Sequence, residues 1–278
     1  MIASRRLRAV YFAGMMPLIA VILLPYAIML SGALKSPAEI VQPQFRFLPE
    51  QPRPGNFVEV FQAMPLARFF LNSTIIAVGA MLVVLGCAVP AAYALGRLRF
   101  PGRRAILFVI LTTQMFSPIV LIIALFSQFT GYGLLQGARC YLALILANAA
   151  WALAFGTWLL TGYFSTVPRE VEEAALIDGC SRWQALTRVL LPICRPGVVT
   201  TMIFAFIAAW NEFVFALTFV PSDEFRPLTV AIPSFIGQYG AQWHLLMAAA
   251  LLATIPVVVM FLLVEKHLVR GLSAGAIK

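Results

Sequence analysis

Very few side chains of this 278-residue sequence have the type and spacing that catalysis requires. No Gly-x-x-x-x-Gly-Lys-Ser/Thr phosphate loop occurs, so the sequence has no nucleotide-binding motif of that kind. Its 2 His and 4 Cys residues lack metal-binding or disulfide spacing, and neither paired carboxylates nor a nucleophile motif is recognisable. We therefore expect no catalytic residue, no metal site and no cofactor bound by this chain.

Charged and turn-forming residues follow a clear pattern between residues 168 and 196. Pro168 suits the first turn of a helix, and Ser165 to Val167 can provide its N-cap. The acidic residues that follow complement the positive end of the helix dipole. Gly179 suits the left-handed position that ends a helix, and Ser181 can cap a second one. The pattern predicts a helix, a turn and a helix.

The second of these helices has an apolar side. Trp183 and Leu186 are three residues apart, and Val189 or Leu190 follows after one more turn, so all of them fall on one side. Such a side needs to be covered. It packs either against the inner ends of the chain's own membrane helices or into a cleft on a soluble partner, and these residues alone favour neither.

The elements that must position this loop are membrane helices. The composition is 62% hydrophobic and 11% charged, with a mean hydropathy of +0.92, far from the balance of soluble domains. Because a helical span needs roughly 20 apolar residues, the sequence predicts an all-α membrane protein with six spans. They are Tyr11 to Leu30, Phe70 to Leu95, Ala105 to Phe129, Tyr141 to Leu160, Val198 to Val220 and Trp243 to Val264.

The positions of Lys and Arg predict the orientation, because basic residues near span ends stay in the cytoplasm. Fourteen of the 20 fall on one side of the six-span arrangement. They are Arg5, Arg6, Arg8, Arg97, Arg99, Arg103, Arg104, Arg169, Arg182, Arg188, Arg195, Lys266, Arg270 and Lys278. Both termini are thus expected in the cytoplasm. The same distribution accounts for the net charge of +9, so we expect no nucleic-acid partner.

Polar residues within the apolar runs are candidates for a solute pathway or a subunit interface. Glu212 is the notable one, because a charge in hydrocarbon is costly and must face a cavity, a partner or the bundle interior. A sugar ligand, a proton relay and a bond between helices are all compatible with it. The candidates are Asn72, Gln114, Asn148, Asn211 and Glu212.

The loop also carries a recognisable signature. Glu173-Ala174-Ala175, then Gly179, Val189 and Leu191-Pro192 resemble the EAA motif of binding-protein-dependent ABC importer permeases, with Val189 where isoleucine is usual. Secondary segments are similar to the carbohydrate, or maltose-type, group of that family. These segments are residues 33–37, Asn72-Ser73, 210–213, 237–240 and 269–276.

The resemblance implies the type I ABC importer permease fold, a single domain over residues 1–278 and a cytoplasmic coupling loop at 163–196 that docks on an ATPase. The coupling residues would be Glu172, Glu173, Ala174, Ala175, Asp178, Gly179, Trp183, Leu191 and Pro192. A second ATPase contact would lie in the tail, at Arg270, Gly271, Ser273, Gly275 and Lys278.

The resemblance also implies the partners: a second permease subunit, two copies of a cytoplasmic ATPase that holds ATP and magnesium, an extracytoplasmic solute-binding protein and membrane lipid. The function expected is uptake of a carbohydrate or related solute across the bacterial inner membrane. The alternative is an ion-coupled secondary transporter that acts without an ATPase. Such proteins typically have inverted repeats and several buried ionisable residues, and here only Glu212 qualifies.

Overall fold

Nearly all the regular structure of this chain is helical. The computed structural model describes the backbone of residues 5–44, 46–237 and 240–275, and the side chains of residues 14–44, 46–237 and 240–263. Within these residues the only strands are β1 (Ile236–Gly237) and β2 (Gly240–Ala241), which pair antiparallel with Ile236 opposite Ala241. The expected all-α class is confirmed.

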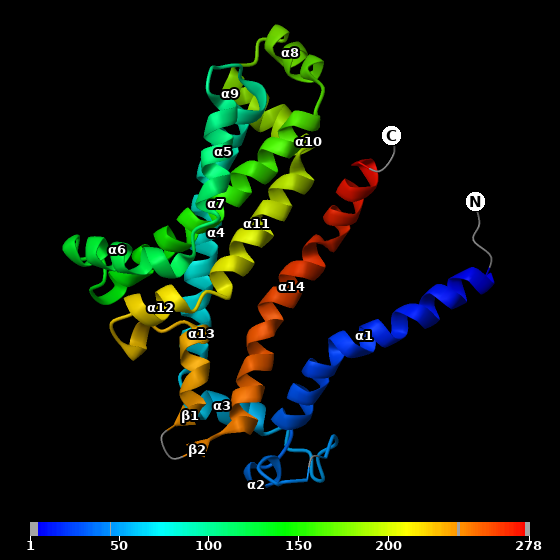
Figure 1. Ribbon diagram of the computed structural model, residues 1–278, viewed down its shortest axis with the longest axis vertical. Coiled ribbons are helices and arrows are strands. Elements are labelled where there is room, and N and C mark those ends of the chain that lie inside the picture. Colours follow the sequence, from blue (N-terminus) through cyan, green and yellow to red (C-terminus); the bar gives the residue numbers. More distant parts are fainter. Residues whose placement is uncertain (1–4, 45, 238–239, 276–278) are drawn as a thin grey trace. The chain divides into compact units, whose positions relative to one another are not determined.

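Four helices are long and apolar enough to cross a membrane, or up to six if each of two bent pairs forms one span. The four are α1 (Arg5–Ala33), α4 (Leu66–Arg97), α7 (Cys140–Thr166) and α14 (Trp243–Gly275) (Figure 1). The shorter elements are α2 (Pro37–Ile40), α3 (Asn56–Ala63), α5 (Arg103–Thr113), α6 (Pro118–Gly131), η1 (Gly137–Arg139), α8 (Arg169–Ile177), α9 (Arg182–Gln184), η2 (Ala185–Leu190), α10 (Leu191–Ile193), α11 (Arg195–Trp210), α12 (Val214–Phe219), η3 (Asp223–Phe225), α13 (Leu228–Ala231) and η4 (Ile232–Phe235).

Two of the six predicted spans are not single straight helices. The run Ala105 to Phe129 divides into α5 and α6, which meet at 93°. Ser117 ends the continuity, because its hydroxyl accepts the Ile119 N–H and caps α6, with Pro118 in the first helical position. The run Val198 to Val220 is likewise interrupted, since α11 ends at Trp210 and α12 begins at Val214. A hydropathy average cannot register these caps.

The chain forms two compact units. The first consists of residues 1–67 and 232–255. There the buried Asn56 amide donates to the backbone oxygens of Ala33 and Lys35, at 2.8 Å each, and so fixes the start of α3 to the end of α1. Gly32 lies directly against the Met247 side chain of α14, which would have to move if residue 32 had a Cβ. Both contacts hold the turns at this end of α1.

The second unit, residues 68–231 and 256–278, contains the helices that carry the candidate loop. Within it α4, α7 and α11 approach closely through small residues (Figure 1). A Cβ at Gly156 of α7 would lie 3.0 Å from the Thr201 methyl of α11 and 3.2 Å from a Val84 methyl of α4. Such residues let membrane helices pack tightly where apolar burial alone provides little driving force.

We expect Gly156→Leu to disrupt this unit, because overpacking typically costs about 1–3 kcal/mol and here three helices must separate. Gly162→Leu is the matched control, since Gly162 lies on the same helix and a Cβ there would meet no heavy atom within 4 Å. Thermal unfolding of the purified chain in mild detergent should show a lower midpoint for Gly156→Leu alone. Equal midpoints for the two variants would contradict the packing described.

Candidate functional site

The turn between α8 and α9 has the conformation that the sequence predicts. Gly179 has a φ of +86°, and the Cys180 N–H donates to the Ala175 oxygen at 3.0 Å while the Gly179 N–H donates to the Leu176 oxygen at 3.2 Å. These two bonds form a Schellman motif, which satisfies the last carbonyls of α8. Ser181 then caps α9, because its hydroxyl accepts the Gln184 N–H at 3.3 Å.

The start of α8 differs from the prediction. Ser165 to Val167 do not cap it, because α7 continues to Thr166 and the Ser165 hydroxyl donates to the Thr161 oxygen at 2.7 Å. Pro168 takes the N-cap position without a side-chain cap bond. The short hinge between α7 and α8, Val167 and Pro168, is therefore not fixed by a side-chain cap of its own, and its backbone must be bonded by residues from elsewhere in the chain.

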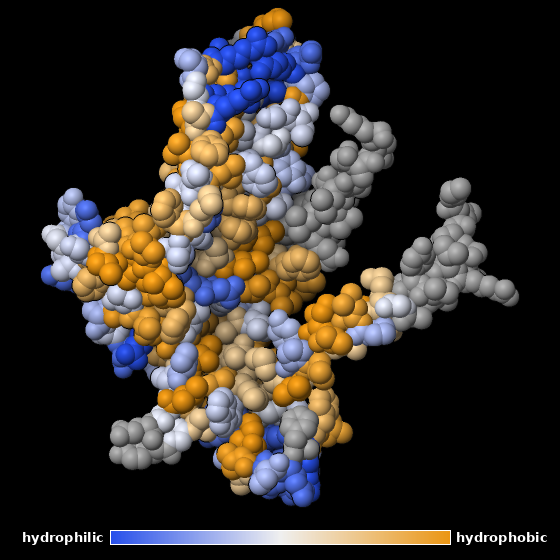
Figure 2. Space-filling model, in the orientation of Figure 1, coloured by the Kyte–Doolittle hydropathy of each residue, from blue (hydrophilic) through white to orange (hydrophobic). Residues whose placement is uncertain are grey.

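One face of α8 is directed away from the rest of its unit. Its exposed residues are Glu170, Glu173, Ala174 and Ile177, at positions i, i+3, i+4 and i+7, and we call them the outer stripe. Ala175 points the other way and is buried. Ile177 is 86% exposed although this end of the unit is otherwise strongly hydrophilic (Figure 2). Ile177 therefore gives the outer stripe an exposed apolar end.

Trp183 also faces outward, and this corrects one prediction. The sequence pattern placed Trp183 on the same side as Leu186 and Leu190. Leu186 and Leu190 are fully buried, whereas Trp183 is 62% exposed. The helix contains a π-helical segment, η2, whose wider turn shifts the residues after it relative to those before it. Leu186 and Leu190 thus pack within the chain, as one interpretation of the apolar side predicts, while docking of the exposed Trp183 on a partner stays a prediction.

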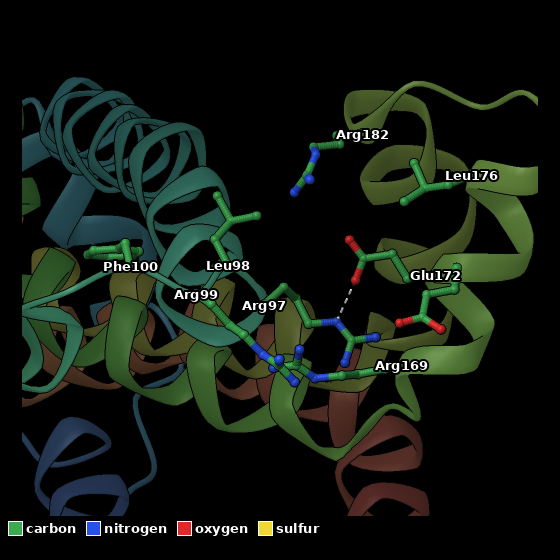
Figure 3. A pocket seen from close by; sticks show the side chains of 9 residues that line it. Arg97, Leu98, Arg99, Phe100, Arg169, Glu172, Leu176 and Arg182 are labelled. Atoms are coloured by element: carbon green, nitrogen blue, oxygen red, sulfur yellow. Dashed lines mark ion pairs between the residues drawn. The ribbon is translucent and has the colours of Figure 1, made fainter.

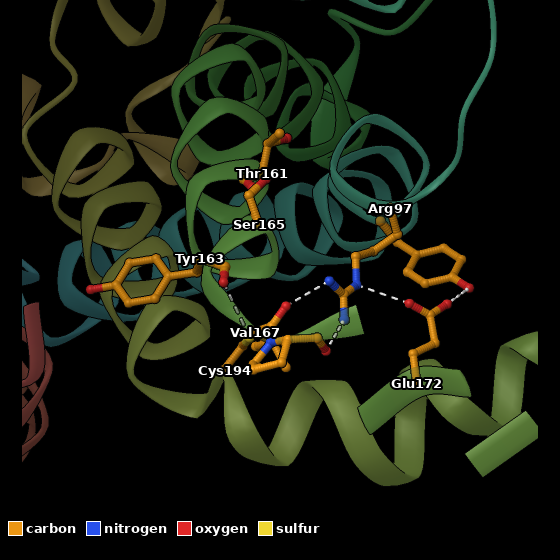
Figure 4. Close-up of polar contacts among 9 residues, drawn as sticks. Arg97, Thr161, Tyr163, Ser165, Val167, Glu172 and Cys194 are labelled. Atoms are coloured by element: carbon orange, nitrogen blue, oxygen red, sulfur yellow. Dashed lines mark hydrogen bonds and ion pairs between the residues drawn. The ribbon is translucent and has the colours of Figure 1, made fainter. Parts of the chain in front are cut away.

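A buried arginine fixes the inner face of α8. The Arg97 Nε, at the end of α4, lies 2.9 Å from a Glu172 carboxylate oxygen. Its other two nitrogens donate to the backbone oxygens of Val167, at 2.7 Å, and Pro168, at 3.1 Å. The Tyr93 hydroxyl donates to the second Glu172 oxygen at 2.6 Å. Figure 4 shows these contacts, which we call the Arg97 anchor.

The Arg97 anchor is buried, and its polar atoms have hydrogen-bond partners, except Arg97 Nε and the Glu172 oxygen that it approaches as an ion pair without hydrogen-bond geometry. The side chains of Arg97 and Glu172 are only 3% and 12% exposed. Desolvation of such a pair is costly, so it persists only where further hydrogen bonds satisfy both groups. Here the two carbonyls and the tyrosine provide them. The anchor joins α4 to the hinge before α8 and to α8 itself.

Sequence reasoning missed Arg97 and Tyr93 as site residues. In the sequence Arg97 is one of fourteen basic residues on the predicted cytoplasmic side, and nothing in a single sequence separates a buried arginine from its solvated neighbours. A weak signal exists: Tyr93 lies one helical turn before Arg97, on the same face.

The rest of the loop returns to the membrane helices. Leu191 is half-buried and Pro192 is exposed, and both belong to α10. Asp178 is exposed at the end of α8. Beyond them Gly197, at the start of α11, packs against the Tyr163 ring of α7. The residues of the predicted coupling set thus lie on one continuous segment of the chain. Some of them are exposed, whereas Ala175 is buried and Glu172 and Leu191 are partly buried.

Asn72 has its hydrogen bonds satisfied within the unit. Its amide donates to the backbone oxygens of Glu224, at 3.1 Å, and Arg226, at 2.8 Å, and its oxygen accepts the Tyr141 hydroxyl at 2.7 Å. The Leu228 N–H bonds the neighbouring Ser73 hydroxyl. These bonds attach the segment before α13 to α4 and α7.

The other four polar candidates bond different stretches of backbone. Glu212 accepts the N–H groups of Phe215 and Ala216 at 2.6 and 3.0 Å and so caps α12. Gln114 donates to the Trp151 oxygen at 2.8 Å. Asn148 and Asn211 each donate to a carbonyl one turn earlier in their own helices. The structure therefore does not bring these four side chains together into one polar site.

The predicted tail contact falls mostly outside the described residues. Helix α14 includes Arg270, Gly271, Ser273 and Gly275, but their side chains are not among those described, and neither is any part of Lys278.

If the Arg97 anchor is a coupled unit, its residues should not act additively. We expect Arg97→Met alone to cost about 3–5 kcal/mol, because it leaves the Glu172 carboxylate buried without its cation. The double variant Arg97→Met with Glu172→Met should lose less than the sum of the two single changes by at least about 1 kcal/mol. Thermal unfolding of all four proteins measures this difference. Strict additivity would show that the two residues do not interact.

Comparison with known proteins adds independent information. Residues 88–274 match the family described as binding-protein-dependent transport system inner membrane component. The trehalose/maltose transport system permease protein MalG of Thermococcus litoralis is 39% identical over 226 residues, 80% of either chain. The sulfoquinovosyl glycerol transport system permease protein SmoH of Agrobacterium fabrum is 34% identical, over 92% of this chain and 89% of that one.

A solved structure is also similar in fold. It is a chain of a bacterial ABC transporter involved in the import of the acidic polysaccharide alginate, with a TM-score of 0.79 and 24% identity, over 96% of this chain and 99% of that one. The coupling-loop signature, the helical membrane fold and these matches agree. The chain belongs to the family of inner membrane components of binding-protein-dependent ABC importers, and it is a multi-pass permease subunit.

Proposed function

We propose that this permease subunit imports a carbohydrate or a closely related solute, such as a di- or oligosaccharide, a polyol or a glycerol phosphate. The names of similar proteins support this class: besides the two permeases above, the diacetylchitobiose uptake system permease protein NgcG of Streptomyces coelicolor is 31% identical over 99% of this chain. The substrates in these names differ from one another, so the proposal is limited to the class.

We also propose the full six-span arrangement, with α5 and α6 together forming one span, the run from Val198 to Val220 forming another, and both termini in the cytoplasm. Residues 1–278 would form one permease domain whose coupling loop covers residues 163–196. The distribution of basic residues supports this orientation, and the hydrophilic end of the unit that carries α8 agrees with a loop outside the bilayer (Figure 2).

The observation that carries the proposed mechanism is the arrangement of α8. Its outer stripe is free to contact a partner, while its inner face is bonded to α4 through the Arg97 anchor. We infer that the outer stripe, Trp183 and the Gly179 turn dock on a soluble ATPase subunit. Coupling would require both faces, because a docking helix that moved independently of the spans could not transmit motion to them.

The remaining residues of the coupling set have supporting roles in this proposal. Ala175 is buried and lets α8 lie close to the spans, and Asp178 lies at the exposed turn. Leu191 and Pro192 redirect the chain into α11. Residues 270–278 would add a second contact with the ATPase.

The proposed complex contains a second permease subunit, two copies of the ATPase and an extracytoplasmic solute-binding protein, within membrane lipid. ATP and magnesium would bind the ATPase subunits. One solved structure similar in fold to this chain is a bacterial alginate ABC transporter in complex with a periplasmic protein bound to alginate pentasaccharide, and it has a TM-score of 0.67 at 16% identity.

Most polar residues within the spans have a structural role in this proposal rather than a role in solute binding. Asn72 and Glu212 form their hydrogen bonds with backbone groups at breaks in the helices. Asn211 is exposed on the surface of this chain, which suits a subunit interface, while Gln114 and Asn148 remain candidates to line the pathway.

The turn at Gly179 offers a sharp test of docking. Leucine in the left-handed conformation costs about 1–2 kcal/mol, whereas asparagine tolerates it. Because a Cβ at Gly179 would meet no atom within 4 Å, only the backbone conformation distinguishes the two variants inside the chain. We expect Gly179→Leu to reduce the ATPase subunit recovered with the affinity-purified chain, measured by mass spectrometry, and Gly179→Asn to preserve it.

Full recovery of the ATPase with both variants would argue against a role for this turn in docking. Recovery of the wild-type chain alone, in a form that drives uptake under an ion gradient without ATP, would favour the secondary-transporter alternative.

A further inference from the structure

A cavity of about 570 Å³ lies beside α8, next to the outer stripe, with which it shares Glu173. Its walls come from the end of α4 and the residues just after it, the inner side of α8 and the start of α9. The charged residues that line it are Arg97, Arg99, Arg169, Arg182, Glu172 and Glu173. Figure 3 shows the side chains of Arg99, Arg169 and Arg182 directed into this space from three different segments.

The charges around the cavity do not balance. Arg97 and Glu172 neutralise each other in the Arg97 anchor. Among the described residues, Arg99, Arg169 and Arg182 form no ion pair with any carboxylate, and of the cavity's acidic groups only Glu173 remains to offset them. The wall therefore has an excess of two positive charges. Like charges that line one concave surface repel one another, and an anion bound between them offsets this electrostatic repulsion.

The lining indicates which kind of anion fits. Arginine presents a planar fork of donors that matches phosphate oxygens in pairs. Arg97 is already held rigid by the backbone oxygens of Val167 and Pro168, so part of the site is ordered before any ligand arrives. Leu98, Phe100 and Leu176 complete the lining and give room for an apolar or organic group. The volume lies within the range of about 300–1,000 Å³ that is usual for small-molecule sites.

We propose that this cavity binds a phosphate-bearing anion, either the headgroup of an anionic phospholipid or a free phosphorylated metabolite. The bound phosphate would join the segment after α4, the inner side of α8 and the first residue of α9. It would thereby hold the coupling loop in the position that the Arg97 anchor sets. The inference is tested separately from docking of the outer stripe, because phosphate binding is measured on this chain without the ATPase, although Glu173 belongs to both surfaces.

The test uses the full chain in nanodiscs of phosphatidylcholine, with inorganic phosphate as the probe and calorimetry as the measurement. The variant R99Q/R169Q removes two cavity guanidinium groups and leaves the Arg97 anchor intact. R188Q is the matched control, because Arg188 is an exposed arginine of the same loop that does not line the cavity. We expect saturable binding by the wild type and R188Q, and at least about tenfold weaker binding by R99Q/R169Q, since hydrogen bonds to charged groups are strong.

Should R99Q/R169Q fold poorly, R182Q alone provides a second variant, with a smaller loss of affinity expected. Absence of saturable phosphate binding together with absence of retained lipid, or equal affinity in wild type and R99Q/R169Q, would overturn the proposal.

Nanodiscs of phosphatidylglycerol separate the two sources of phosphate. If a lipid headgroup occupies the cavity, these discs should abolish binding of inorganic phosphate. Native mass spectrometry should then show phosphatidylglycerol retained by the wild type and lost from R99Q/R169Q. If the ligand is a free metabolite, binding of inorganic phosphate should be the same in both lipids. Either result supports the site and identifies its occupant.

Discussion

The structure of the candidate site depends on one buried ion pair. Arg97 and Glu172 are withdrawn from water, and a buried pair of this kind persists only when nearly all of its hydrogen-bonding groups find partners. Those partners are the Tyr93 hydroxyl and the carbonyls of the hinge between α7 and α8. The requirement fixes the hinge as well as the helix, because its backbone oxygens are part of the arrangement. The start of α8 has no side-chain cap, and the bonds from Arg97 to the hinge fix its backbone instead.

The same constraint governs the membrane helices. Backbone groups in a bilayer must be satisfied by the protein, since no water is there to receive them. Where a span is broken, polar side chains take over this role: Glu212 caps α12, Ser117 caps α6, and Asn72 bonds the carbonyls of the segment before α13. Polar residues that could be taken for a solute pathway therefore serve chiefly the breaks.

Several features were predictable because their causes are local. The turn at Gly179 and the cap at Ser181 follow from residue types that favour one backbone conformation, and apolar length predicts the spans. The bend after α5 has a local cause of the same kind, because Ser117 is a helix cap and Pro118 suits a first helical turn. The outward position of Trp183 and the Arg97 anchor were not predictable. The first depends on a π-helical turn and the second on a partner 75 residues away in the sequence, as Glu172 is from Arg97, and a single sequence contains no signal for such long-range pairing.

We propose that α8 and α4 move as one body when the ATPase closes. The direct test is the distance between spin labels at residue 169 of α8, which is exposed and lies outside the outer stripe, and the exposed residue 82 of α4, in a cysteine-free chain within the assembled complex. The distance distribution should be unchanged on addition of ATP, although the complex as a whole responds to the nucleotide. A shift of that distribution with ATP would mean that α8 moves independently of α4, and it would contradict the role given to the buried arginine.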